Sequence, residues 1–265
     1  MEHPIITLTT DWGSRDFFVG MMKGRLLSKI PGVQIVDISH DIEKFDLLSA
    51  SYVVKHACVG FPPKTIHIID VDTHIPFVVV EYKEQYFICS DNGLPSIVFG
   101  NDFRMAVRLE VRRDEKSFYT FSALKLFTQV AQLLVQGEPI ESLGEPLTQL
   151  QSKNFVGYTE MPNGLRLGVA YIDGYGNANL NITYSDFERL RAGRKFRIRL
   201  RDREYEIKEI VQSYDTPPSN SPARYLPIIA TVSITGHLQI ALCNQSAQQL
   251  IGIQRGTPII VEWLS

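Results

Sequence analysis

Short apolar runs alternate with amphipathic segments along the first seventy residues of the chain. Ile5–Thr9, Val33–Ile38 and Thr65–Val71 are rich in β-branched residues and predict strands, because such side chains fit a pleated surface. Phe17–Ile30 and Asp46–Val59 lie between them and predict helices, each followed by a stop that contains Gly and Pro. This alternation is typical of parallel strands joined by right-handed crossovers, so we expect an α/β domain with a mainly parallel sheet flanked by helices.

The pattern changes in the second half of the chain. Phe77–Tyr82 and Tyr86–Cys89 predict paired strands, and Phe127–Val135 predicts a helix, before a polar, turn-rich stretch around Gly144–Asn154. Short predicted strands then follow with one helical piece near Ser185–Arg191: Leu165–Ile172, Lys195–Leu200, Glu204–Val211, Ile228–Thr231, Leu238–Leu242 and Thr257–Trp263. Such a run predicts an antiparallel barrel or sandwich. We therefore expect an α/β domain over residues 1–150 and a smaller, barrel-like β domain over residues 151–265.

Composition and charge narrow the class of partner. The chain has 265 residues, 44% hydrophobic and 21% charged, which is ordinary for a soluble globular protein. Its net charge of -2 provides no basic field for nucleic acid or an anionic membrane, and no apolar run approaches the length of a membrane span. Cys58, Cys89 and Cys243 stand far apart in apolar stretches and predict buried thiols in a reducing compartment. With no signal-peptide pattern at its start, the chain is predicted to be cytoplasmic and to bind a small molecule.

Polar residues follow the predicted parallel strands, at the edge where ligands gather in α/β sheets. After the first strand, Asp11 suits the two hydroxyls of a ribose and Asp16 suits an ammonium group. The alternative is that one of these carboxylates caps the following helix. After the second strand, His40 and Asp41 are expected to point to opposite sides, so His40 is expected to bond to a loop carbonyl.

The stretch His67–His74 combines acidic and imidazole side chains. If the strand extends far enough, Asp70, Asp72 and His74 share one face because side chains alternate along a strand. Such a set holds a metal or activates water, or it is simply a solvated strand end. The sequence is compatible with both interpretations.

A glycine- and amide-rich loop is predicted at Asp173–Asn181. It lacks the strand–loop–helix context of a phosphate cradle, which argues against a nucleotide phosphate. Asn amides match the mixed donors and acceptors of an adenine edge, whereas a turn stabilised by Asx side chains is the structural alternative.

Taken in order, these segments resemble the S-adenosyl-L-methionine (SAM) hydroxide adenosyltransferases, a family related to the SAM-dependent fluorinases and chlorinases. The matching stretches span nearly the whole chain: Ile6–Gly13, Pro31–Asp46, Phe61–Asp72, Asp91–Leu94, Leu133–Gly144, Ile172–Asn177 with Asn181-Ile182, and Gly236–Gly252. The resemblance implies a homotrimer, with SAM at the seam between one subunit's N-terminal domain and a neighbour's C-terminal domain. It implies SAM as substrate and neither cofactor nor metal.

The resemblance also implies roles for individual residues. The implied substrate-binding set is Asp11, Asp16, Phe45, Asp173, Tyr175, Asn177, Ser246 and Ala247. In it, Asp11 would hold the ribose hydroxyls, and Asp16 and Asp173 would face the methionine ammonium. Phe45 would lie against the ligand, and Asn177 would read the adenine edge with help from the backbone around Ser246 and Ala247.

The family reaction is displacement at the ribose C5′ carbon, in which water or hydroxide replaces methionine and leaves adenosine. The hydrolases use an Asp–Arg–His set, and Asp72 matches its Asp. The glycine loop that follows is shortened to Thr73–Pro76, no Arg occupies the family position, and Ser122 stands where His is expected. His74 and Lys125 are the candidate replacements, since they lie close to the altered positions in sequence.

These departures leave competing hypotheses. The first is a SAM hydrolase whose catalytic residues are Asp72 and His74. The second is a degenerate protein that binds SAM or adenosine without turnover. The third is a different hydrolase or transferase that uses Asp70, Asp72 and His74 around a metal. Halogenation is not expected, because the spacing between Asp72 and Asp91 leaves no room for the extra loop of the halogenases.

Overall fold

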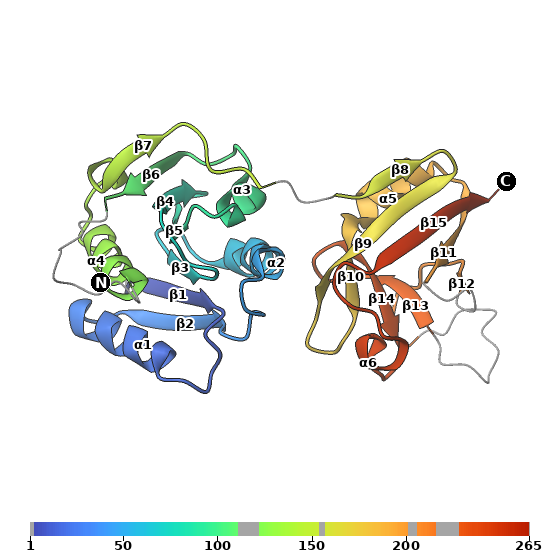
Figure 1. Cartoon of the computed structure of the whole chain (residues 1–265), viewed down its shortest axis with the longest axis horizontal. Coiled ribbons are helices and arrows are strands. Elements are labelled where there is room, and N and C mark those ends of the chain that lie inside the picture. The colour runs from blue at the N-terminus through green and yellow to red at the C-terminus, as the bar shows by residue number, and fades with distance from the viewer. Residues whose placement is uncertain (1–2, 111–121, 154–156, 201–205, 216–227, 265) are drawn as a thin grey trace. The chain divides into compact units, whose positions relative to one another are not determined.

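The chain forms two compact units, Met1–Asn154 and Phe155–Ser265, in the computed structural model. The structure describes residues 3–110, 122–153, 157–200, 206–215 and 228–264 (Figure 1). Each unit has a hydrophobic core of its own. Among the described residues, no helix is both long and apolar enough to cross a membrane.

The N-terminal unit is a mixed sheet with helices, in the strand order β2-β1-β3-β5-β4-β6-β7. Its strands are β1 (Ile5–Thr10), β2 (Gln34–Ser39), β3 (Ile66–Asp70), β4 (Phe77–Tyr82), β5 (Gln85–Ser90), β6 (Met105–Leu109) and β7 (Gly144–Leu147). Strands β2, β1, β3 and β5 pair in parallel, and β4, β6 and β7 add antiparallel pairings. The sheet is mixed because Lys83 and Glu84, both at positive φ, close a tight hairpin between β4 and β5. The predicted α/β class is confirmed.

Helices cover the sheet and bury the strands that carry the site. The helical segments are α1 (Phe18–Lys29), α2 (Leu47–Ala57), η1 (Cys58–Gly60), α3 (Leu94–Phe99), α4 (Ser122–Val135) and η2 (Ile140–Ser142). Met22 and Leu26 of α1 and Phe127 of α4 share one core with Leu8 of β1 and Ile68 of β3. Helices α2 and α3 pack against each other beside the sheet (Figure 1). Strands β1 and β3 are buried along almost their whole length, including their polar residues Thr7, Thr9 and His67.

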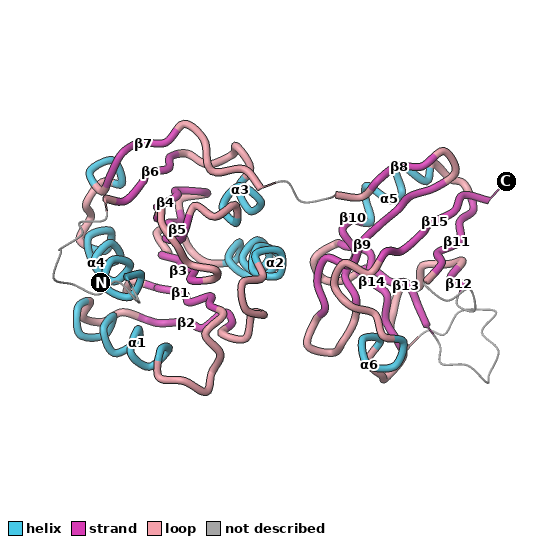
Figure 2. Tube along the Cα trace, in the orientation of Figure 1, coloured by secondary structure: helices cyan, strands magenta, loops and turns pink. Residues whose placement is uncertain are grey.

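The C-terminal unit is an antiparallel, nearly closed barrel. Its elements are β8 (Thr159–Met161), β9 (Gly164–Ile172), β10 (Ala178–Thr183), α5 (Tyr184–Arg191), β11 (Lys195–Arg199), β12 (Glu206–Ile207), β13 (Ile228–Val232), β14 (His237–Leu242), α6 (Ala247–Ile251) and β15 (Pro258–Leu264) (Figure 2). The sheet runs β12-β11-β15-β9-β10-β14-β13, with β8 paired to β9. A bridge between Ile210 and Ala230 brings the segment after β12 to β13, which nearly closes the sheet on itself. The predicted barrel-like domain is confirmed.

One predicted loop in this unit is shorter than expected. The sequence indicates a loop over Asp173–Asn181, but β10 begins at Ala178 and runs to Thr183. That prediction is wrong because Ala178, Leu180 and Ile182 alternate with polar residues and are buried in the barrel core. The run of asparagines conceals this period of two.

The start of α2 depends on one carboxylate. Asp46 accepts hydrogen bonds from the backbone N–H of Leu48 and of Ser49, each at 3.1 Å, and from the Ser49 hydroxyl at 2.6 Å. The Asp46 side chain is buried. If it were removed, the first N–H groups of the helix would lose their acceptor, and water could not replace it. Asp46 also follows Phe45 directly, so this cap fixes the end of the loop that contains Phe45.

We therefore expect Asp46→Ala to lower the free energy of unfolding by about 1–2 kcal/mol, the usual cost of losing a helix cap. Urea denaturation measures this loss. Asp41→Ala is the matched control, because Asp41 is an exposed aspartate in the same connection and its loss should change stability by about 0.5 kcal/mol or less. Equal losses in the two variants would refute the capping role.

Candidate active site

The Asp11 carboxylate joins three loops of the N-terminal unit. It follows β1, and its Oδ2 accepts from the Phe45 backbone N–H at 3.0 Å and from the Asp72 backbone N–H at 3.3 Å. Asp11, Phe45 and Asp72, all predicted from the sequence, are thus brought together. We call them, with His74, the N-terminal site.

Neither predicted carboxylate caps the first helix. The N-cap of α1 is Phe17, which makes no side-chain capping bond, so the capping alternative for Asp11 and Asp16 is wrong. The exposed Asp16 accepts from the next backbone N–H, that of Phe17, at 2.7 Å. No bond joins Asp16 to the N-terminal site among the described residues.

Two residues of the N-terminal site hold a left-handed backbone. Phe45 has a φ of 64° and Asp72 a φ of 47°, values that cost free energy for residues other than glycine. The hydrogen bonds to Asp11 hold both conformations in place. Phe45 is 70% exposed, which leaves its ring free to lie against a ligand. Strain of this kind gathers at functional sites.

The Asp72 carbonyl orients the neighbouring histidine. It accepts from Asn92 Nδ2 at 3.0 Å and lies 2.8 Å from His74 Nδ1. Since a carbonyl only accepts, a neutral His74 carries its proton on Nδ1 and keeps the lone pair on Nε2. The His74 backbone N–H donates to Ser90 Oγ at 2.9 Å, which fixes the loop. His74 is exposed, so Nε2 is available as a base.

The shared strand face predicted for Asp70, Asp72 and His74 is wrong. Strand β3 ends at Asp70, and the left-handed Asp72 turns the chain out of the strand. Within the described residues, no three His, Cys, Asp or Glu side chains lie close enough together to hold a metal ion. The metal-dependent alternative therefore lacks a ligand set in this part of the chain.

Asp70, the last residue of β3, is a carboxyl group in an unusually buried position. It is 2% exposed; its Oδ1 accepts from the Thr73 hydroxyl, and its Oδ2 has no hydrogen-bond partner among the described residues. Burial raises the pKa of Asp70 to about 7; the charge of Asp11 adds to this rise and the Thr73 bond opposes it. Asp70 is therefore protonated in a large fraction of molecules near neutral pH.

His40 links the ends of β1 and β2. Its Nδ1 lies 2.9 Å from Thr10 Oγ1, and its Nε2 lies 3.1 Å from Asp37 Oδ1. The prediction that His40 bonds to a loop carbonyl is wrong, because a hydroxyl and a carboxylate on adjacent strands offer better partners. Partial burial of Asp37 opposes its ionisation, but hydrogen bonds from Lys23 and His40 outweigh it and lower its pKa.

The C-terminal unit gathers the other predicted residues around Asp173. Its Oδ1 accepts from the backbone N–H of Tyr175 and of Asn177, each at 2.9 Å. Its Oδ2 accepts from Asn177 Nδ2 at 3.1 Å and from Gln239 Nε2 at 3.0 Å. Asn177 is buried, whereas Tyr175 is 85% exposed. We call Asp173, Tyr175 and Asn177, with Ser246 and Ala247, the C-terminal site.

Helix α6 packs directly against this loop. A Cβ on Gly176, which has a φ of 81°, would lie 2.0 Å from Ser246 Oγ, so only glycine fits there. The Gln248 backbone N–H donates to the Gly176 carbonyl at 2.9 Å. Ser246 and the buried Ala247 are thereby placed beside the loop, as the predicted set requires.

Sequence reasoning missed three residues that organise these sites. Asn92 holds the Val71 and Asp72 carbonyls, and the signal available was the Asp91-Asn92-Gly93 turn after a strand. Gln239 is a buried amide between Leu238 and Ile240 of β14, and a polar residue at that place in an apolar stretch is the signal available. Tyr214, whose hydroxyl donates to Gln239 Oε1 at 2.6 Å, carries no sequence signal. Ser122, which stands where the family has its His, begins α4. The candidate replacement Lys125 is exposed on the same helix, and its role stays a prediction.

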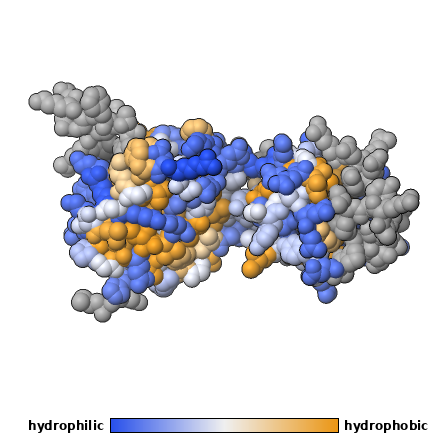
Figure 3. Space-filling model, turned by 90° about the horizontal axis from the view of Figure 1, so that it is seen from below, coloured by the Kyte–Doolittle hydropathy of each residue, from blue (hydrophilic) through white to orange (hydrophobic). Residues whose placement is uncertain are grey.

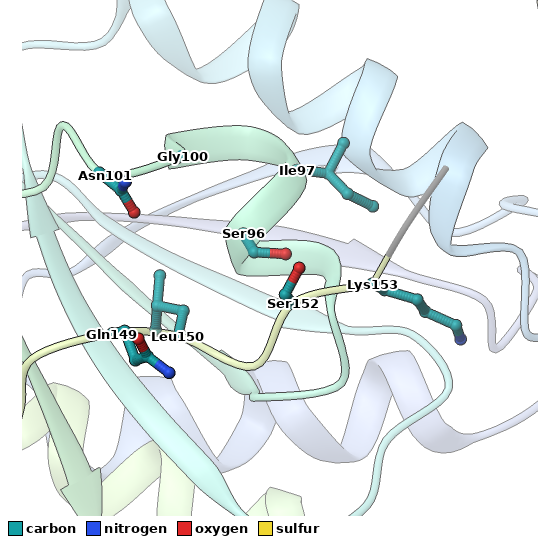
Figure 4. A pocket seen from close by; sticks show the side chains of 8 residues that line it. All are labelled: Ser96, Ile97, Gly100, Asn101, Gln149, Leu150, Ser152 and Lys153. Carbon is teal, nitrogen blue, oxygen red and sulfur yellow. The ribbon is translucent and has the colours of Figure 1, made fainter. Parts of the chain in front are cut away.

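A separate pocket of about 280 Å³ lies between α3 and the segment 149–153 (Figure 4). Its polar lining comes from Ser96, Asn101, Gln149, Ser152 and Lys153, and no predicted site residue lines it. These polar residues are not buried, and Lys153 is the one charged group in the lining. The pocket provides no group for the chemistry of the N-terminal site.

Asp70 generates a prediction about pH. Because its pKa is raised to about 7 in the folded state, the folded protein holds more protons than the unfolded chain between about pH 4 and 7. The free energy of unfolding should therefore fall as pH rises through that window, by up to about 4 kcal/mol at 1.36 kcal/mol per pKa unit.

Urea denaturation of wild type and Asp70→Asn from pH 4 to 8 isolates this effect, because Asn does not titrate. Burial lowers the pKa of His67 to about 4, which acts in the opposite direction, but it acts in both proteins and cancels in the difference. A difference between the two proteins that does not change with pH would contradict the assignment.

Comparison with known proteins gives the family. Family models match both units, the SAM hydroxide adenosyltransferase N-terminal domain at residues 6–144 and the C-terminal domain at residues 167–260. The (R)-S-adenosyl-L-methionine hydrolase of Methanocaldococcus jannaschii is 30% identical over 192 residues, which cover 67% of this chain and 66% of that protein. The enzyme of the same name from Thermus thermophilus is 25% identical over 264 residues, 94% of this chain and 96% of that one.

The fold agrees with a solved structure. The crystal structure of an uncharacterized conserved protein from Thermotoga maritima superimposes with a TM-score of 0.82 at 25% identity, covering 97% of this chain and 99% of that one. With both family models matched in order along the sequence, the chain belongs to the SAM hydroxide adenosyltransferase family.

Proposed function

We propose that this protein binds SAM and hydrolyses it to adenosine and L-methionine by attack of water or hydroxide at the ribose C5′ carbon. Family membership and relatives named (R)-S-adenosyl-L-methionine hydrolase support the reaction. The observation that carries the proposal is the junction at Asp11, which brings Asp72 and His74 to the edge of the sheet where α/β folds bind ligands. No cofactor is required, because SAM brings its own leaving group.

The N-terminal site supplies a matched acceptor for ribose. Asp11 Oδ2 is used by the loops, while no hydrogen bond among the described residues uses Oδ1. A carboxylate oxygen accepts two hydrogen bonds, so Oδ1 suits the 2′- and 3′-hydroxyls of the sugar. The exposed ring of Phe45 offers an apolar surface beside them.

The chemistry then needs a base for the attacking water. As its oxygen bonds to C5′, the water gives a proton to His74 Nε2, the C5′–S bond breaks, and the electron pair stays on the methionine sulfur. Asp72 orients this base, because its carbonyl lies 2.8 Å from His74 Nδ1, accepts the proton there and leaves Nε2 to face the water. Methionine leaves as a neutral thioether, so no acid is needed for the leaving group. This assigns His74 the part that the family's missing His would take.

His74→Ala should lower the rate of adenosine release about 10²–10⁴-fold, the usual contribution of a general base. Chromatography of SAM digests measures this rate. His3→Ala is the matched control, because His3 is an exposed histidine whose Nδ1 is also bonded to a carbonyl, that of Gly32. Equal rates in wild type and His74→Ala would dismiss His74 as the base.

Affinities for SAM and adenosine, measured beside adenosine release, distinguish the hydrolase from a degenerate protein that only binds. Asp11→Ala should weaken both SAM and adenosine by about 10–100-fold, because it removes hydrogen bonds to a charged group. Asp16→Ala should weaken SAM and leave adenosine unchanged if Asp16 faces the methionine ammonium. Calorimetry measures both affinities. Tight SAM binding by the wild type without adenosine release would favour the binding protein, and no binding at millimolar concentrations would sink both hypotheses.

The homotrimer and the cytoplasmic location belong to the same proposal. Three apolar side chains remain exposed in this region: Phe17, which directly precedes α1, Leu27 in the last turn of α1, and Val36 of β2. Figure 3 shows apolar area on the face of the N-terminal unit that it presents. Such area is typical of subunit contacts. The unpaired thiols of Cys58, Cys89 and Cys243 favour a reducing compartment.

A further inference from the structure

Another pocket, of about 150 Å³, lies in the N-terminal unit. Its walls come from the end of α2 with η1, from the β4–β5 hairpin and from α3 (Figure 1). We call it the hairpin pocket. The hairpin precedes β5, whereas the N-terminal site follows the ends of β1 and β3. Since β3 and β5 pair in parallel, the hairpin pocket and the N-terminal site belong to opposite ends of these strands.

Three aromatic rings line the hairpin pocket and pack on one another. The centroid of the Phe99 ring lies 4.7 Å from that of Phe87 and 5.2 Å from that of Tyr82. The two pairs are inclined by 62° and 49°, a geometry that aromatic rings prefer over face-to-face stacking. An apolar cavity of about 150 Å³ holds one benzene ring. The hairpin pocket therefore matches one further aromatic ring in both volume and lining.

The rest of the interior is apolar or neutral. Val54, Val59 and Val98 add branched side chains to the walls. Burial raises the pKa of the Cys58 thiol to about 12, so this lining residue carries no charge near neutral pH. The Gln85 amide nitrogen donates to two backbone carbonyls. A ring that enters the pocket would therefore exchange water for apolar contacts, and this transfer stabilises the complex.

Among the described residues, every charged group that lines the hairpin pocket is basic. Lys55 of α2 and Lys83 of the hairpin are exposed, and His56 adds positive charge when it is protonated. The Lys83 ammonium lies 5.2 Å from the centroid of the Tyr82 ring, which places it against the aromatic wall. No Asp or Glu of the described ranges takes part in the lining. The exposed rim of the pocket therefore favours an anion.

We propose that the hairpin pocket binds a small aromatic carboxylate, with its ring against Tyr82, Phe87 and Phe99 and its carboxylate at the ammonium groups of Lys55 and Lys83. Such a ligand buries its apolar part, while its charge stays at the rim with oppositely charged partners and access to water. A small anion without a ring would leave the aromatic interior empty. The inference goes beyond the proposed hydrolysis, because no residue of the N-terminal or C-terminal site lines this pocket.

Calorimetry of the full-length protein with benzoate, benzyl alcohol and acetate tests the proposal. Wild type should bind benzoate about 3–10-fold more tightly than benzyl alcohol, which has the ring without the charge, because ion pairs at an exposed rim contribute modestly. Acetate has the charge without the ring and should bind about 10–100-fold more weakly than benzoate. If benzoate does not bind at millimolar concentrations, or if benzyl alcohol or acetate binds as tightly, the inference is overturned.

A double variant, Lys55→Gln with Lys83→Gln, tests the charge. It removes both ammonium groups from exposed side chains, so the benzoate affinity should fall to that of benzyl alcohol, whose own affinity should not change. Lys64→Gln is the matched control, because Lys64 is also exposed, has a positive φ as Lys83 does, and does not line the pocket. Benzoate that binds the double variant as tightly as wild type overturns the role of the lysines.

NMR of valine methyl groups locates the bound ring, since an aromatic ring shifts the resonances of methyl groups packed against it. Benzoate should shift the methyl resonances of Val54, Val59 and Val98, and leave those of Val36 and Val232, exposed valines outside the pocket, unchanged. Shifts confined to valines outside the pocket would overturn the inference.

The outcomes also separate this inference from the proposed function. Adenosine release from SAM should proceed at the same rate in wild type and in the double variant, because the pocket contains no group of the N-terminal site. A protein that releases adenosine but does not bind benzoate overturns the pocket alone. A protein that binds benzoate at these valines without releasing adenosine overturns the hydrolysis alone.

Discussion

The N-terminal site depends on one interaction, the acceptance of two backbone N–H groups by the carboxylate of Asp11. Hydrogen bonds to a charged group are about twice as strong as those between neutral groups. Here they hold two non-glycine residues, Phe45 and Asp72, in the left-handed region that each would otherwise leave. Asp11 therefore holds both the loop before α2 and the loop after β3. His74 lies in the second of these loops, so its position also depends on Asp11.

Carboxylates organise loops throughout the chain by the same rule. Asp46 caps α2, Asp91 accepts from the Gln151 backbone N–H at 2.9 Å, and Asp173 closes the loop before β10. Each is an acceptor that meets backbone donors with no partner in a strand or helix. Asp173, like Asp11, also belongs to the set that the sequence predicts to bind the ligand.

The fold could be predicted from the sequence where the spacing of apolar residues was regular. The site could be predicted where polar residues directly follow a strand. Strands β1, β2 and β3 and the helices between them were predictable because β-branched runs alternate with amphipathic ones. Strand β10 was not, since asparagines hide its alternation. Asp11, Asp72 and Asp173 were predictable from their positions after strands. The burial of Asp70 and the Tyr214–Gln239 link were not, because burial and long-range contacts leave no local pattern.

In the described part of the chain, β2 pairs with β1 alone, which leaves its outer row of peptide groups open to other chains. An open row of this kind invites edge-to-edge pairing and fibre growth. Asp37 stands in the middle of that strand, and its ion pair with Lys23 sets charge beside the open row. A second molecule that added a strand there would have to strip water from both charged groups. The pair that supports His40 thereby also guards the protein against aggregation.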